Sequence, residues 1–141
     1  MINTFTKGMN LKSLIVTILA VFFWIFVSDF LVHGIVLKSQ YQATASLWRS
    51  EAEMTSHMVW MILGQITIAK FTVLLFVHGY KGTGIGEGIR FGFLIGCLFI
   101  GSYLIQYAVT PLTCSIVLGW AGLGLVQAIG AGIIAATIYR N

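Results

Sequence analysis

The chain has 141 residues, of which 58% are hydrophobic and only 9% are charged, whereas about a quarter of the positions in a soluble domain carry charge. This composition excludes an ordinary soluble domain, and no polar segment is long enough to enclose a core of its own. The formal net charge of +4 would suit a nucleic-acid partner in a soluble protein, but here the basic residues lie next to apolar stretches. We therefore expect a lipid bilayer as the partner, and no nucleic-acid binding.

Four apolar stretches fill most of the chain, at about residues 14–37, 54–77, 91–109 and 116–138. Since an α-helix rises about 1.5 Å per residue, each stretch can cross a hydrocarbon core about 30 Å thick. The first stretch exceeds the roughly 7 to 15 apolar residues of a secretory signal and contains Asp29 and His33, so we expect it to be retained. The sequence predicts an all-α protein with one domain, residues 1–141, folded as an integral membrane four-helix bundle with short connections.

The basic residues at the ends of the spans predict the orientation in the membrane. One side carries five of them, and the other side carries two: Lys7, Lys12, Lys81, Arg90 and Arg140, against Lys38 and Arg49. Because cytoplasmic segments are enriched in Lys and Arg, this bias predicts that the N- and C-termini are both cytoplasmic. The connections at residues 38–53 and 110–115 are then the outer ones.

Two local patterns mark the outer connection. Ser50 and Glu53 have the spacing of a capping box, which predicts that helix two begins near Glu51 and ends at Gly79. Upstream of it, aromatic residues recur at helical spacing around residues 41–48. This spacing fits a short helix at the outer membrane interface, and it fits an irregular loop with two anchoring aromatic rings equally well.

The glycine-rich segment at residues 79–88 invites comparison with a phosphate-binding loop. It lacks the GxxxxGK[ST] pattern, and no strand precedes it as a dinucleotide-binding turn requires. We interpret it as a cytoplasmic turn between two helices.

Spans three and four carry small residues at every fourth position. The repeats are Gly88, Gly92 and Gly96 in span three, and Gly124, Ala128, Gly132 and Ala136 in span four. Such stripes allow transmembrane helices to approach closely. They predict helix packing, either between spans three and four or between this chain and another subunit.

Polar residues inside the spans are the candidate functional residues. Asp29, His33, His57 and Gln65 fall in the outer halves of spans one and two and are expected to form one polar cluster. Three interpretations remain open: a hydrogen-bond cluster that fixes helix packing, a proton or ion path, or a metal or haem site at His33 and His57. Two histidines without further ligands are weak support for the third, so we predict no metal and no cofactor.

Lys70 is the second charge within a span. It lies about 12 Å from Asp29 along the membrane normal by helical rise, which permits a strained ion pair. Its ammonium could equally extend to the cytoplasmic interface. No Ser-His-Asp, GxSxG, HExxH or paired-carboxylate motif is present, so we assign no catalytic residue and consider an enzyme the less favoured class.

A resemblance covers most of the chain. The residues that carry it are His33, Gly34, Leu37, Tyr41, Thr44, Leu47, Trp48, Arg49, Glu53, Met54, Gly64, Gln65, Gly86, Glu87, Gly88 and Arg90. In this pattern the sequence resembles small four-span bacterial inner-membrane proteins of uncharacterised function. The resemblance implies a bacterial inner membrane location with multiple spans, and it implies no catalytic residue.

The sequence leaves three classes of function. The first is a non-catalytic accessory subunit or assembly factor of a larger inner-membrane complex, whose partners are other membrane-protein subunits or copies of itself, because small-residue stripes and apolar surface suit partner helices. The alternative is a small oligomeric transporter or channel for protons or small cations that uses the Asp29 region. The third is a redox or haem-binding membrane subunit that uses His33 and His57.

Overall fold

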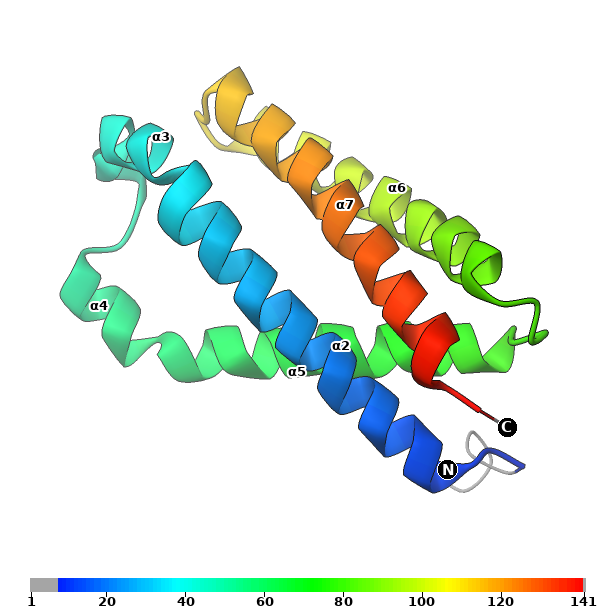
Figure 1. Cartoon of the computed structure of the whole chain (residues 1–141). Coiled ribbons are helices and arrows are strands. Elements are labelled where there is room, and N and C mark those ends of the chain that lie inside the picture. Colours follow the sequence, from blue (N-terminus) through cyan, green and yellow to red (C-terminus); the bar gives the residue numbers. More distant parts are fainter. Residues whose placement is uncertain (1–7, 141) are drawn as a thin grey trace.

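The computed structural model describes residues 8–140, so the predicted contribution of Lys7 to the orientation lies outside the described residues. In this range the chain forms four helices that are long and apolar enough to cross a membrane, as expected for a multi-pass membrane protein. They are α2 (Leu11–Leu31), α5 (Met58–His78), α6 (Ile85–Val109) and α7 (Cys114–Ile138) (Figure 1). The predicted all-α four-helix bundle is confirmed.

The segment between α2 and α5, called the outer segment after its predicted orientation, consists of short helical pieces. A π-helical turn, η1 (Val32–Val36), extends α2, and α3 (Lys38–Ala43) and a 3₁₀ turn, η2 (Ala45–Leu47), follow it. The aromatic-rich stretch is therefore a short helix, as one of the two interpretations had it, although the α-helix ends before Ala45.

Helix two is divided, where the sequence predicted a continuous helix. The capping box is confirmed at the start of α4 (Glu51–Ser56), since Glu53 N–H donates to Ser50 Oγ and Glu53 Oε2 accepts from Ser50 N–H at 3.0 Å. The helix then breaks at His57, whose φ of −98° and ψ of 4° lie outside the α-helical region. Its ring Nδ1 lies 2.8 Å from the Glu53 carbonyl oxygen, and this local bond stabilises the break.

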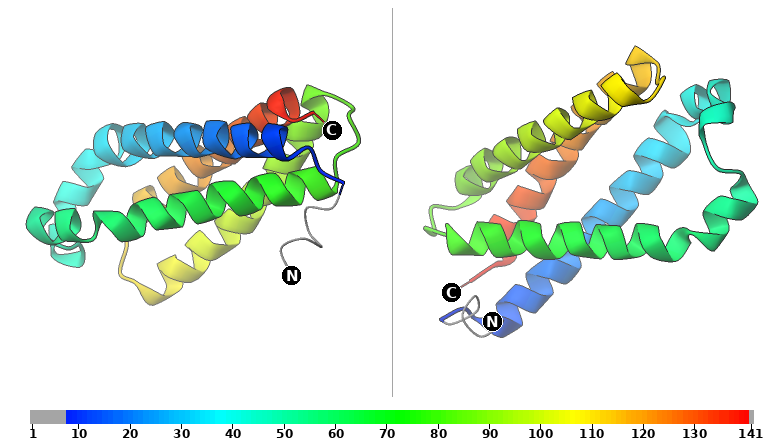
Figure 2. Two further views of the ribbon diagram at one scale, coloured as in Figure 1. Left: turned by 90° about the horizontal axis from the view of Figure 1, so that it is seen from below. Right: turned by 180° about the vertical axis from the view of Figure 1, so that it is seen from behind.

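Helices α6 and α7 pack backbone to backbone and lie side by side in every view (Figure 2). A Cβ atom added at Gly88 would overlap the carbonyl of Gly132, and one added at Gly92 would overlap the carbonyl of Ala128. One added at Gly96 would lie 2.5 Å from a methyl group of Leu125. The small residues are thus what allows this approach, because any larger side chain would separate the helices.

The remaining core lies where α2, α5 and α7 meet. Val21, Val73 and Ala135 are fully buried there. At the end that holds both termini of the described chain, the Arg140 N–H donates to Ser13 Oγ at 2.7 Å. The start of α2 and the end of α7 therefore lie on the same side of the bundle.

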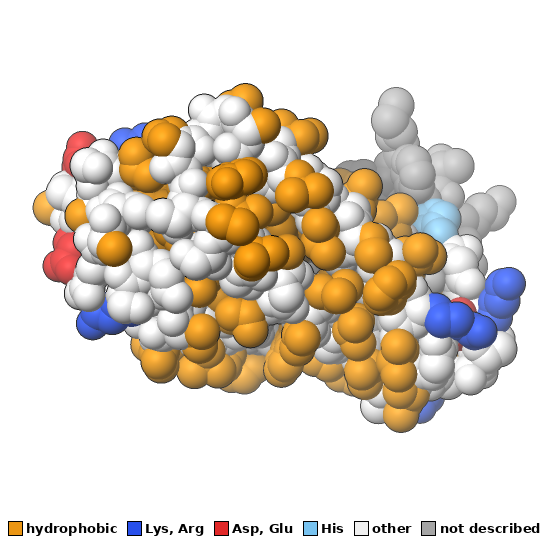
Figure 3. All heavy atoms as spheres, turned by 90° about the horizontal axis from the view of Figure 1, so that it is seen from above, with side chains coloured by type: hydrophobic (Ala, Val, Ile, Leu, Met, Phe, Trp, Pro, Cys, Tyr) orange, Lys and Arg blue, Asp and Glu red, His pale blue; other side chains and the backbone are white. Residues whose placement is uncertain are grey.

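The outer surface matches a lipid environment. Large apolar side chains such as Phe23, Leu98 and Ile105 are more than two-thirds exposed. In Figure 3, hydrophobic side chains cover the middle of the molecule and charged side chains gather toward its two ends. This distribution is the one expected of helices that cross a bilayer.

Candidate functional site: an intramembrane carboxylate beside a cavity

Asp29 joins three of the long helices. It lies in the last turn of α2, within the first candidate span. Its Oδ2 accepts a hydrogen bond from Gln65 Nε2 of α5 at 2.7 Å, and its Oδ1 accepts one from Gln127 Nε2 of α7 at 2.6 Å. Both distances lie at the short end of the range for N–H···O hydrogen bonds. The two donors are uncharged amides, so the carboxylate is solvated by them without being neutralised.

Gln127 is held in place by several contacts with α2. Its Nε2 also donates to Ser28 Oγ at 2.8 Å, and its backbone carbonyl accepts from Trp24 Nε1 at 2.9 Å. The Trp24 indole fits because Gly130 has no side chain, since a Cβ there would lie 2.5 Å from the indole ring. The position of the amide beside Asp29 is therefore fixed by the packing of α2 on α7.

Gln65 has an unpaired oxygen. The residue is buried, and its Oε1 has no hydrogen-bond partner in the part of the chain that the structure describes. A buried polar atom left without a partner costs about 1–3 kcal/mol. The Gln65 amide thus donates to Asp29 through its nitrogen, while its oxygen keeps the capacity to accept a hydrogen bond.

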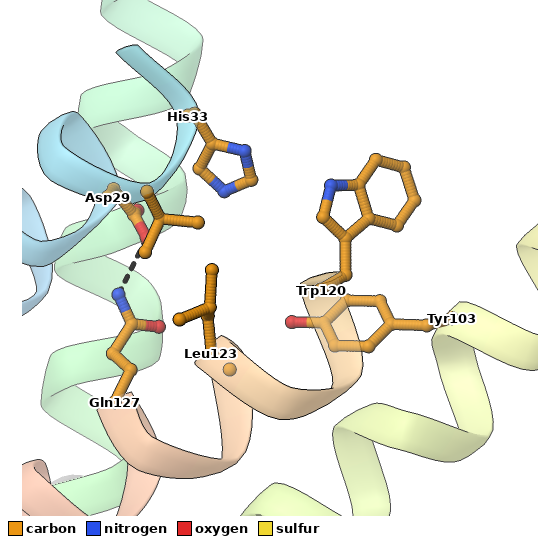
Figure 4. Close-up of a pocket in the computed structure, with 8 residues that line it drawn as sticks. Asp29, His33, Tyr103, Trp120, Leu123 and Gln127 are labelled. Atoms are coloured by element: carbon orange, nitrogen blue, oxygen red, sulfur yellow. Dashed lines mark hydrogen bonds between the residues drawn. The ribbon is translucent and has the colours of Figure 1, made fainter. Parts of the chain in front are cut away.

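A cavity of about 230 Å³ borders Asp29 on the side of α6 and α7 (Figure 4). Its lining residues come from α2, η1, α6 and α7: Asp29, Val32, His33, Tyr103, Trp120, Leu123, Gly124 and Gln127. Gly124 leaves room for the Tyr103 ring, because a Cβ there would lie 3.1 Å from the Tyr103 hydroxyl. Among the small residues along α7, Gly124 therefore differs from Ala128 and Gly132, since it faces a side chain and borders the cavity.

A hydrogen-bonded aromatic cluster joins two of the lining residues, His33 and Trp120, through Tyr41. The Tyr41 hydroxyl accepts from Trp120 Nε1 at 2.7 Å and lies 2.5 Å from His33 Nδ1. Burial raises the pKa of the Tyr41 hydroxyl, so it remains protonated at neutral pH. With its oxygen engaged by Trp120, Tyr41 can donate its proton to Nδ1 of a neutral His33, which then carries its own proton on Nε2.

The aromatic rings link the outer segment to both α6 and α7. The Trp120 ring centroid lies 5.7 Å from that of Tyr103 and 6.3 Å from that of Trp48. The π-helical turn η1 carries His33 near its start, and π-helical turns often occur at functional sites. The outer segment thus reaches the cavity through Val32 and His33 of η1, and of these two residues the sequence predicted His33 as a site residue.

The predicted cluster is only partly assembled. Asp29 and Gln65 are hydrogen-bonded, and His33 lines the same cavity. His57 is exposed and bonds within its own segment, to the Glu53 carbonyl and to Ser56 Oγ at 3.0 Å. Placing His57 in the cluster was wrong, because the helix break directs its ring back onto α4. The structure therefore does not bring His33 and His57 together as a pair of metal or haem ligands.

The possible ion pair between Asp29 and Lys70 is also not formed in the described chain. Lys70 is exposed, and its Nζ lies 5.5 Å from the centroid of the Phe71 ring. The inward face of α5 is set by Gln65 and Ala69, which are four residues apart and both buried. Lys70 is one residue further on, about 100° around the helix, so it points away from α2.

The sequence did not predict that Tyr103 and Trp120 line a cavity, or that Gln127 bonds Asp29. Gln127 of α7 lies at the same depth in the bundle as Asp29, and this shared depth is the signal that could have paired the two residues. Nothing in the sequence marked Tyr103 or Trp120 as a site, because single aromatic residues in a span are common. Comparison of the chain with protein-family models, curated proteins and solved structures finds no match.

Proposed function

We propose that the protein is a small transporter or channel of the bacterial inner membrane that takes up protons or small cations at Asp29. The observation that supports this proposal is the position of the Asp29 carboxylate, which lies within a span, borders a cavity and is bonded to uncharged donors. Ionisable residues inside a membrane are costly and commonly mark ion or proton pathways.

The charge balance of the site favours a cation as its ligand. The cavity-lining residues include one carboxylate and no Lys or Arg, and His33 is their one basic side chain. Lys70, the other charge in a span, is directed away on α5. A carboxylate without a cationic partner in a low-dielectric region attracts a positive ion or a proton.

The Gln65 amide provides a way to hold the protonated state as well. If the amide rotates by 180°, its unpaired Oε1 can accept a hydrogen bond from the O–H of a neutral Asp29 carboxyl, while Gln127 continues to donate to Oδ1. The other titratable groups that face this site are His33 of η1 and Tyr103 of α6, with Tyr41 of α3 bonded behind His33. The same three helices can therefore bind both protonation states of Asp29 without unpacking.

The proposed orientation places the cavity in the outer half of the bundle. Both ends of the described chain lie on one side, and we infer that this side is cytoplasmic from the excess of Lys and Arg there. Asp29 and Trp120 are closer to the opposite side, where α3 and the start of α7 lie. The ligand would then enter from the periplasmic side.

Flux measurements in proteoliposomes test the proposal. We expect the purified protein to carry a proton or sodium flux above that of empty vesicles, and Asp29→Asn to abolish it while the protein still inserts and elutes as the wild type does. Lys70→Gln is the matched control, because it removes the other intramembrane charge from a lipid-facing position and should leave the flux intact. A wild-type flux equal to that of empty vesicles, or an Asn variant with full flux, would refute the proposal.

A second candidate, the accessory subunit, is favoured by the outer part of α5. The first residues of α5 are exposed, and they present the apolar side chains of Val59, Trp60 and Met61. The preceding α4 is exposed as well. Gly64 has open space where a side chain would lie. This segment offers an apolar surface to the helix of another subunit or of a second copy. Cysteine cross-linking from Trp60→Cys in native membranes, with Phe23→Cys on α2 as the control, would give a discrete product if such a partner is present.

A further inference from the structure

We infer that the cavity beside Asp29 binds a small organic ammonium ion, a ligand class that deepens the proposed cation function and rests on it. The site combines one carboxylate with aromatic walls in a space of about 230 Å³. That volume is below the roughly 300–1,000 Å³ of sites for drug-sized ligands, and it far exceeds the roughly 30 Å³ of one water molecule. A ligand of a few carbon atoms fits it, and a larger drug does not.

The aromatic residues favour an organic cation over a metal ion. The side chains of Tyr103 and Trp120, whose ring centroids lie 5.7 Å apart with an interplanar angle of 56°, line the cavity on the side away from Asp29 (Figure 4). The faces of such rings attract cations, and quaternary ammonium ions are commonly recognised by aromatic cages. A metal ion that enters the cavity without its water shell requires several oxygen ligands, and aromatic carbon atoms do not supply them.

The small number of oxygen atoms at the site also favours an organic cation over a metal ion. A calcium ion takes about six to eight oxygen ligands, whereas this cavity offers one carboxylate and few other side-chain oxygens. Among the described residues, no group of three or more His, Cys, Asp or Glu side chains could hold a metal ion. Each oxygen of Asp29 accepts one amide hydrogen bond and can accept a further one from a ligand.

The glycine in the cavity wall fits the same inference. Gly124 borders the cavity, and a Cβ there would lie 3.1–3.6 Å from atoms of the Tyr103 ring. A larger residue at this position would therefore fill the space that the ligand needs. Gly122, two residues earlier on α7, has open space at the corresponding point and provides a matched control.

Binding of tetramethylammonium to the purified protein in detergent tests the inference. We expect saturable binding by calorimetry, together with a rise in Tm that sodium chloride at the same ionic strength does not give. Asp29→Asn and Gly124→Val should abolish binding, and Gly122→Val should preserve it. Trp120→Leu should weaken binding by roughly 2- to 30-fold, the range of one cation–π contact, and Trp120→Phe should restore part of the loss because it keeps a ring.

The outcomes separate this inference from the proposed function. No binding of tetramethylammonium to a wild-type protein that still carries an Asp29-dependent proton or sodium flux would overturn the ammonium site and leave the proposed function standing. Binding that is unchanged in both Asp29→Asn and Gly124→Val would also overturn it, because the ligand would then bind elsewhere. Elution profiles and the Tm without ligand identify variants that fail to fold, and for these the milder Gly124→Ala replaces Gly124→Val.

Discussion

The half of the α6–α7 pair near the described termini, named the inner half after the predicted orientation, and the opposite half, named the outer half, pack in different ways. In the inner half, Gly88 and Gly92 bring the two backbones into direct contact with Gly132 and Ala128. In the outer half, the Tyr103 and Trp120 rings lie where small residues lie further in, and the cavity opens beside them. Side-chain size along one helix pair thus determines where the bundle is closely packed and where a cavity forms.

The same division separates the kinds of interaction that join α2 to the bundle. Near the termini, α2 packs through apolar residues such as Val21, which is fully buried. Near the outer side, it is joined through Asp29 and its two amide partners. Interhelical hydrogen bonds in membranes contribute only about 0.6 kcal/mol on average, so the apolar half holds the fold while the polar half is available for function.

The largest expected effect on the free energy of unfolding comes from substitutions in the inner half of the α6–α7 pair. Gly92→Leu and Gly132→Leu should each destabilise the protein by about 1–3 kcal/mol or more, because their side chains would overlap the backbone of the facing helix. Gly101→Leu is the control, since it lies on α6 with open space around it. Thermal unfolding in detergent measures the difference, and equal Tm values for Gly92→Leu and Gly101→Leu would show that the close contact does not stabilise the fold.

A smaller effect is expected in the polar half, where two variants of Asp29 should differ. Asp29→Leu leaves the buried Gln65 Nε2 without its acceptor, at a cost of about 1–3 kcal/mol, whereas Gln127 Nε2 keeps Ser28 Oγ as an acceptor. Asp29→Asn should cost less, because rotation of the Gln65 amide lets its free Oε1 accept from the new amide. Thermal unfolding of both variants checks the order, and a less stable Asn variant would contradict it.

The sequence predicted the close packing of the inner half better than the cavity of the outer half. A repeat of small residues at every fourth position is a local pattern with one physical use in a span, so Gly88, Gly92 and Gly96 could be assigned to packing directly. The fold class followed equally directly from the length of the four apolar stretches. These features depend on residues near one another in sequence.

The cavity depends on residues far apart in sequence, and for that reason it was mostly missed. The Asp29 and Gln127 side chains are 98 residues apart, and the Tyr41 and Trp120 side chains are 79 apart. Their pairing follows from how α2 lies against α7, which periodicity within one helix does not reveal. The sequence also did not reveal the helix break at His57. This break keeps His57 out of the polar cluster in which it was predicted.

The smallest expected effect lies outside the membrane, at the capping box of α4. Hydrogen bonds from Ser50, first from its side chain and then from its backbone, lower the pKa of Glu53 below the ordinary Glu value. Because the pKa is lowered in the folded state, the capping box should be fully formed above the ordinary Glu pKa and lost as the pH falls through the lowered one. The amide chemical shifts of Ser50 and Glu53, followed by NMR, should therefore titrate with a midpoint below the ordinary Glu value. Ser50→Ala should move this midpoint upward and fray α4 at neutral pH, whereas an unchanged midpoint would show that Ser50 does not set it.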